Sequence, residues 1–302
     1  MALAFKLDLD KDLSRAFRRL AADEIGKTCV RLGAPPEERE AAIHGARKSL
    51  KKVRALVKLA RPSLDGSYDP LNGTLRDVGR GLSGARDATA LIECLDKLEA
   101  AFGKGLKKRA LAGTRRVLTE RRDAVLADAA KVGSQIEGSV ERLGKARRTA
   151  RRASWPQSKA DLKNDYERSY RACRKAWKAV REDAGGEVAH EWRKRTKALS
   201  AQIGLLRAEI GAETAALREA LIDLGERLGD HHDLTVLEAA IVDEPSVPAE
   251  ERKLLEGLIE AERRAIRRFA LSEGERLLAR KPAAFARRLR ASWNGARRLA
   301  QV

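Results

Sequence analysis

The sequence predicts an all-α protein made of two tandem helical bundles. Only eight prolines interrupt its 302 residues, and apolar residues recur at steps of three and four along most of the chain, which is the spacing of an amphipathic helix. No stretch alternates strongly enough between apolar and polar residues to indicate a strand. A set of motifs from the first half returns in the second half in the same order. We therefore predict one bundle in residues 1–150 and another in residues 151–302.

The first half is expected to hold four helices with short connections, which is the make-up of an antiparallel bundle. Pro35 and Pro36 separate the first two helices, and residues 63–73 resemble a loop because Gly, Pro, Asp and Asn are frequent there. The predicted helices span residues 10–32, 42–61, 74–101 and 104–143, the last as one long helix or as two.

The second half is expected to begin after a basic connector at residues 145–155, which leads to Pro156. Gly185 and Gly186 end its first helix, and residues 245–248 form a turn. The predicted helices of this half span residues 161–182, 188–207, a segment that ends near 241, 249–279 and 282–300.

The helix expected at residues 42–61 has an unusual cationic face. It contains no acidic residue, and its apolar residues form a separate stripe. Like charges three and four residues apart repel each other by about 0.2–0.5 kcal/mol per pair. The face is therefore either a solvated basic surface or a surface that an outside anion neutralises. Its cationic residues are His44, Arg47, Lys48, Lys51, Arg54 and Lys58.

A second copy of this face lies in residues 188–207. At an offset of 190 − 44 = 146 residues, the first four cationic positions recur as His190, Arg193, Lys194 and Lys197. Further along, residues 82–87 and 228–233 match at the same offset, 233 − 87 = 146. Matching motifs in constant register indicate an internal duplication. Because the duplication retains the cationic face, binding is favoured over a role in solubility alone.

Composition narrows the partner to a polyanion. The chain has 63 Lys and Arg against 44 Asp and Glu, a net charge of +19 and a pI near 10.2. Such a balance fits nucleic acid, an anionic membrane surface or another phosphate polymer. The three cysteines are scattered, which fits a reducing, cytoplasmic compartment. We also see no signal peptide and no apolar run of about eighteen residues that could span a membrane.

Four short motifs, in order, resemble those of the CHAD (conserved histidine α-helical domain) family. They cover nearly the whole chain, and the second half matches best. The similar segments are Tyr-Arg-Ala-Cys-Arg-Lys at 170–175, His-Glu-Trp-Arg-Lys-Arg-Thr-Lys at 190–197, Leu-Gly-Asp-His-His-Asp-Leu at 228–234 and Lys-Pro-Ala-Ala-Phe at 281–285.

The resemblance implies two four-helix bundles related by a pseudo-twofold axis, with histidines and basic residues lining a shared groove. It implies inorganic polyphosphate as the ligand. The contacts would be the repeated cationic positions of both halves, with Arg171 and Arg174 in addition and Arg18 as a weaker candidate. No ExExK stretch is present, so the resemblance implies binding without the phosphohydrolase chemistry of the triphosphate-tunnel domain found in many relatives. Storage, granule targeting and signalling all remain open as the cellular purpose.

Non-specific nucleic-acid binding is the first alternative. Charge alone would favour it, but base readout uses Asn, Gln and Arg, and single strands need aromatic platforms. The chain has three Asn, four Gln and 4% aromatic residues. We therefore expect nucleic acid to bind through phosphates only, at low salt. An anionic membrane or granule surface is a third candidate partner, although bundle packing uses the apolar stripes.

A metal-dependent phosphohydrolase is the rival among enzymes, because His232 and Asp233 resemble the His-Asp pair of such sites. Those sites need several histidines and acids around one metal, and this chain has four histidines, two of them in the repeated face. We expect no catalytic residue, no metal and no cofactor. His231 and His232 are weaker candidates for phosphate contact, since the equivalent positions hold Ala85 and Arg86.

The remaining groups are given supporting roles. Asp87 and Asp233 would repel phosphate, so each is expected to orient a basic side chain or a histidine. A polyanion near His44 and His190 would favour the imidazolium form, so binding is expected to strengthen as pH falls.

Overall fold

The computed structural model describes residues 5–9, 12–103, 105–107, 109–127, 129–183, 185–206 and 210–299. Within these ranges the regular structure is helical and no strand occurs, which confirms the all-α class. Four predicted helix ends, at residues 10, 104, 207 and 300, fall outside the described residues. None of the described helices is long and apolar enough to cross a bilayer.

The helices of the first half include two short 3₁₀ turns, η1 and η2. In chain order they are α1 (Leu13–Leu32), η1 (Pro36–Glu38), α2 (Arg39–Leu59), α3 (Arg61–Leu64), η2 (Asp65–Ser67), α4 (Tyr68–Gly81), α5 (Gly84–Phe102), α6 (Ala112–Ala127) and α7 (Ala129–Arg152). The second half contains α8 (Lys159–Glu182), α9 (Gly186–Gly204), α10 (Ala212–Ile241), α11 (Ala249–Leu278) and α12 (Pro282–Leu299).

The loop predicted at residues 63–73 is wrong, because α3, η2 and α4 follow one another there. Pro62 and Pro70 lie in the first turns of α3 and α4, where the missing N–H of proline costs no helical hydrogen bond. Asp65, with φ at 42°, marks the change of direction. Turn-forming residues at helix starts therefore resembled a loop in the sequence.

Two other predicted boundaries differ from the structure. The helix predicted at 74–101 is interrupted at Leu82 and Ser83, whose N–H groups bond to Val78 and Arg80 carbonyls, so α4 ends there and α5 starts anew. The predicted connector at 145–155 is helical as far as the end of α7.

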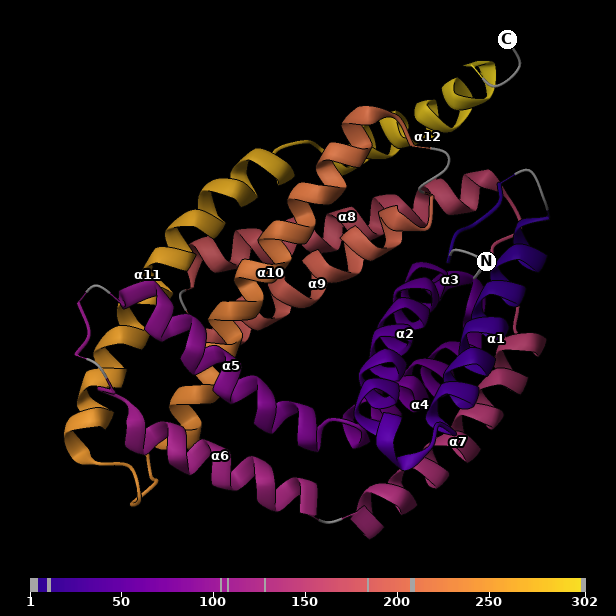
Figure 1. The fold of residues 1–302 in the computed structure, drawn as a ribbon. Coiled ribbons are helices and arrows are strands. Elements are labelled where there is room, and N and C mark those ends of the chain that lie inside the picture. Colours follow the sequence, from indigo (N-terminus) through magenta and orange to yellow (C-terminus); the bar gives the residue numbers. More distant parts are fainter. Residues whose placement is uncertain are drawn as a thin grey trace.

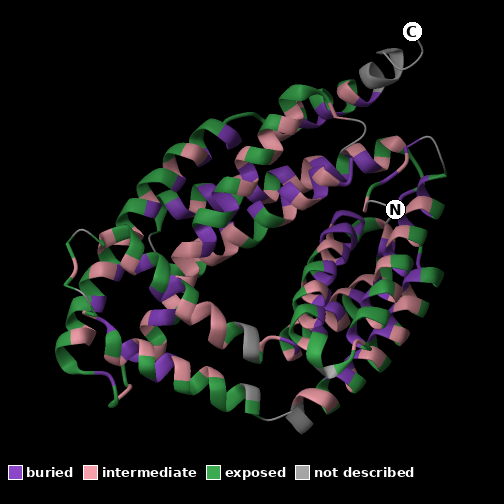
Figure 2. Cartoon of the chain, viewed as in Figure 1, coloured by how far each residue is buried: buried purple, intermediate pink, exposed green. Residues whose placement is uncertain are grey.

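Helices α1, α2, α4 and α7 pack together as one group (Figure 1). A second group consists of α8, α9, α10, α11 and α12, in which α8 and α10 both lie against α9. The buried side chains of the two groups form one continuous cluster. Figure 2 shows buried residues along the helices of both groups. Its fully buried members include Phe17, Val53, Leu75, Tyr166 and Trp192.

Helices α5 and α6 extend away from the first group and pack on α10 and α11 (Figure 1). A second apolar cluster forms there, in which Leu95 and Leu118 meet Leu237 and Ile259. The Lys97 ammonium lies 2.7 Å from the Asp230 carboxylate and joins α5 to α10 at the surface. The two halves of the chain are therefore packed together at two places.

Candidate functional site

The two basic helices of the sequence analysis, α2 and α9, pack against each other. The Gln202 side chain of α9 donates to the Ala55 carbonyl of α2 at 3.1 Å, and the Tyr166 hydroxyl of α8 donates to the Gln202 carbonyl at 2.6 Å. All three residues are buried. These contacts bring the repeated cationic faces of both halves to one part of the molecule.

Cations from both helices lie close enough to perturb one another. Partial burial, then Arg47 and Arg193, lower the pKa of Lys51. Partial burial, then Arg193 and Lys51, lower the pKa of Lys197 to about 8. At the end of α2, partial burial, Arg54 and Arg195 lower the pKa of Lys58 to about 8. The surface is thus a cluster of positive charges that carboxylates neutralise only in part.

Arg47 is held in place from α4 and α5. Its guanidinium donates to the Gly79 carbonyl at 3.1 Å and to the Asp87 carboxylate at 3.3 Å. The Arg47 side chain is only 18% exposed, whereas that of Asp87 is 62% exposed. Asp87 therefore orients a basic side chain, as predicted, although its carboxylate faces solvent.

In the second half, the Arg193 and Lys197 side chains pack over α10 beside Gly225 and Gly229. A Cβ built at Gly229 would lie 3.2 Å from Lys197 Nζ and 3.7 Å from Arg193 Nε, and one at Gly225 would lie 3.1 Å from Lys197 Cγ. The Arg193 Nε is buried and has no hydrogen-bond partner. Burial raises the pKa of Asp233, while Arg193 and Lys197 oppose that rise. The Asp233 carboxylate is therefore part of the same charge cluster.

His232, which the sequence ranked as a weaker candidate, lies beside His190. The two ring centroids are 4.5 Å apart, with the planes tilted by 42°. Burial, then Arg193 and His190, lower the pKa of His232 to about 4, and burial followed by Lys194 lowers that of His190. The position of His232 next to Asp233, in the motif that repeats with the basic helix, is the signal that could have given it more weight.

His231 has different neighbours. Burial, then Arg263 and Arg267 of α11, lower its pKa. The two adjacent histidines therefore differ in environment, and His231 belongs to the contact between α10 and α11.

Several predicted residues already have partners inside the protein. Arg54 donates to the Asn72 side chain at 3.3 Å, and Lys194 lies 2.5 Å from the Glu191 carboxylate. Arg174 donates to the Leu278 carbonyl at the end of α11, at 2.9 Å.

The other candidates lie on α1, α2 and α8. Arg171 is exposed and lies 2.5 Å from the Glu167 carboxylate. The Arg18 Nε on α1 is buried without a hydrogen-bond partner. His44 and Lys48 are exposed on α2.

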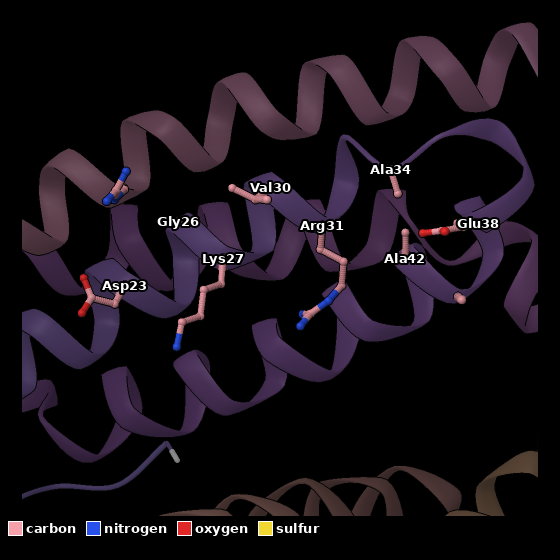
Figure 3. A pocket seen from close by; sticks show the side chains of 10 residues that line it. Asp23, Gly26, Lys27, Val30, Arg31, Ala34, Glu38 and Ala42 are labelled. Carbon is pink, nitrogen blue, oxygen red and sulfur yellow. The ribbon is translucent and has the colours of Figure 1, made fainter. Parts of the chain in front are cut away.

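The surface of α2 and α9 is separate from the cavity of about 930 Å³ that lies between α1, α2 and α7 (Figure 3). That cavity is lined by both signs of charge, among them Asp23, Lys27 and Arg147. Arg31 also lines it and donates to the Ser49 hydroxyl of α2 at 2.8 Å. None of the predicted binding residues lines this cavity.

The described residues contain no group of three or more His, Cys, Asp or Glu side chains that could hold a metal ion. The candidate site consists of cations, Arg47 and Lys51 from one helix and Arg193 and Lys197 from the other, beside a pair of histidines. Chemically, such a surface offers charge-assisted hydrogen bonds to an extended anion.

Fold and site together define a class, that of all-helical proteins with a cationic surface shared by two histidine-bearing helices. The model of the CHAD domain family matches residues 9–242, and the chain belongs to this family. The fold is similar to the crystal structure of the CHAD domain from the plant Ricinus communis, with 19% identity, a TM-score of 0.59 and coverage of 92% of this chain and 94% of that chain. No curated protein matched the sequence.

Proposed function

We propose that this protein binds inorganic polyphosphate on the surface of α2 and α9, without catalysing a reaction on it. The observation that carries the proposal is the approach of cations from the two packed helices. Besides burial, Arg193 of α9 lowers the pKa of Lys51 on α2, and Arg193 and Lys51 lower the pKa of Lys197. The CHAD family is associated with polyphosphate binding. Retention at polyphosphate granules in the cytoplasm would follow from such binding.

The chemistry of the ligand fits a surface of this kind. Polyphosphate carries about one negative charge per phosphate and has no bases, so its receptor needs closely spaced cations and bidentate donors. Burial and repulsion between the cations lower the lysine pKa values, and a bound polyanion would relieve the repulsion. The proposed contacts are His44, Arg47, Lys48, Lys51, Arg54, Lys58, His190, Arg193, Lys194 and Lys197, with Arg18, Arg171 and Arg174 as outlying members.

We also propose that residues 1–150 and 151–302 are duplicated bundles. Subtracting 146 from the bounds of α8 gives 13–36, against 13–32 for α1. The same subtraction turns α9 into 40–58, against 39–59 for α2, and α12 into 136–153, against 129–152 for α7. This correspondence supports a pseudo-twofold relation in which the two basic helices are equivalent partners.

A competition titration tests the ligand. Labelled long-chain polyphosphate is challenged near physiological salt with duplex DNA, single-stranded RNA and heparin at equal charge concentration. We expect polyphosphate to resist each competitor by about tenfold or more, since none of the proposed contacts is an Asn, a Gln or a Phe, Tyr or Trp platform. Equal competition by DNA or RNA would replace the proposal with non-specific nucleic-acid binding.

Charge reversal tests the surface. Arg47→Glu combined with Arg193→Glu is expected to abolish polyphosphate binding, because it replaces one central cation in each half with an anion. The matched control is Arg116→Glu with Arg264→Glu. Both arginines are exposed and lie outside the surface, and each pairs with a glutamate on its own helix. Far-UV circular dichroism should stay unchanged in both. Unchanged affinity in the first variant would rule out this surface.

A further inference from the structure

A second cavity, of about 550 Å³, lies where the start of α10, the end of α11 and α12 meet. Its lining contains none of the residues proposed above to bind polyphosphate. We propose that this cavity binds a small organic phosphate, with one phosphate group carried on an apolar body. Cavities of this size are typical of small-molecule sites.

Three arginines, Arg276, Arg280 and Arg288, line the cavity, and Arg276 is paired with the Glu273 carboxylate at 2.5 Å. Arg280 donates to one oxygen of the Glu213 carboxylate at 2.6 Å, and Arg288 donates to the other oxygen. Among the described residues that line the cavity, Glu213 holds the one carboxylate, so Arg280 and Arg288 together with Glu213 carry a charge of 2 − 1 = +1. Two guanidiniums thus already share one oxyanion, and this is the geometry that binds a phosphate group.

The start of α10 adds to this charge. Its N-cap residue, Gly211, has no side chain to accept from the first-turn N–H groups, and the helix dipole favours an anion at this end. Glu213 stands in that first turn. A phosphate group can take the place of its carboxylate between the arginines and also present a third oxygen to the helix start.

The remaining wall of the cavity is mostly apolar, with Thr214 and Ser292 as its polar members. Leu217, Phe285 and Leu289 line it, and Phe285 stacks on Tyr170 with ring centroids 4.3 Å apart. Phe285 and Leu289 are already buried in the core, whereas Leu217 is half-buried, so an apolar group of the ligand would gain most from covering Leu217. A bare polyphosphate chain has no such group. The charge therefore selects a phosphate, and the wall selects an ester with an aromatic or acyl body.

Calorimetric titration of the full chain with phenyl phosphate tests this site, with inorganic phosphate and benzyl alcohol as the two half-probes. We expect phenyl phosphate to bind at least about tenfold more tightly than either half-probe. Arg280→Ala with Arg288→Ala should weaken it by about tenfold or more, because two charge-assisted hydrogen bonds are lost. Arg116→Ala with Arg264→Ala, remote from the cavity lining, is the matched control.

A second variant acts in the opposite direction. Glu213→Gln should strengthen phenyl phosphate binding severalfold, because it removes the competing carboxylate. Glu219→Gln, which removes an exposed carboxylate of the same helix outside the cavity lining, should leave the affinity unchanged. If the double arginine variant fails to fold, this pair of variants decides the question, and equal affinities overturn the proposal.

Two further results would overturn it. One is equal affinity for phenyl phosphate and inorganic phosphate, which would mean attraction by charge alone. The other is loss of phenyl phosphate binding in the Arg47→Glu and Arg193→Glu variant, which would place the ligand on α2 and α9. Failure of this proposal can be told apart from failure of the polyphosphate proposal, since the Arg280→Ala and Arg288→Ala variant should retain polyphosphate binding.

Discussion

At the scale of single residues, Lys58 and Lys197 should make polyphosphate binding depend on pH. Both have a pKa lowered to about 8, and a bound polyanion favours the charged form and raises that pKa. Binding at pH 8 should therefore take up protons, and affinity should fall as pH rises through 8. Calorimetric heats measured in two buffers of different ionisation enthalpy should differ at pH 8.

The control replaces both lysines by arginine, which keeps its charge at pH 8. In Lys58→Arg with Lys197→Arg, the difference between the heats of binding in the two buffers should shrink, while polyphosphate still binds. Identical heats for the unmodified protein in both buffers would show that these lysines are not coupled to the ligand.

His232 should make the folded state less stable in mild acid. Its pKa falls from 6.5 to about 4 on folding, so the unfolded chain binds more protons between these values and stability decreases as pH falls through that window. The urea concentration at the unfolding midpoint should therefore drop less between pH 7 and pH 5 in His232→Asn than in the unmodified protein. His44→Asn alters an exposed histidine of α2 and is the control. An equal effect of both substitutions would contradict the prediction.

At the scale of elements, Gly274 sets the distance between α11 and the two tryptophans beneath it. A Cβ there would lie 2.4 Å from Trp177 Cδ1 and 2.9 Å from Trp192 Cζ2. Gly274→Ala should destabilise the protein by about 1–3 kcal/mol, because rigid indole rings must move. In the same helix a Cβ at Gly257 meets nothing within 4 Å, so Gly257→Ala should stabilise by about 0.5–1 kcal/mol. Urea unfolding measures both, and a stabilising Gly274→Ala would refute the packing argument.

The elements also mark what sequence reasoning can reach. The period of the apolar residues predicted most long helices. That the constant offset pairs equivalent cations stays a prediction. Periodicity also places Leu95 and Leu98 on one buried face of α5, but it does not name the helix that covers that face. The contact between His190 and His232 depends on how α9 packs on α10. The duplication could not predict it, because the equivalent positions in the first half hold His44 and Arg86.

At the scale of the whole molecule, the continuous core predicts that the two halves unfold together. Trp177, Trp192 and Trp293 all lie in the second half and report on it, whereas Trp155 stacks on Phe17 of the first half at 5.8 Å between ring centroids. In a Trp155→Phe background, tryptophan fluorescence therefore follows the second half alone. Two buried clusters connect this half to the first. One contains Leu59 and Trp293, and the other contains Leu95 and Leu237.

Leu75, fully buried on α4 in the first half, provides the perturbation. Leu75→Ala should cost about 2–5 kcal/mol of unfolding free energy by leaving a cavity. If the halves are one cooperative unit, the tryptophan midpoint in urea must fall together with the far-UV circular dichroism midpoint, because neither half is stable without the surfaces that the other covers. A tryptophan midpoint that stays unchanged while circular dichroism resolves two transitions would mean that the bundles fold independently. In that case the cationic surface of α2 and α9 would be held together by contacts weaker than either bundle.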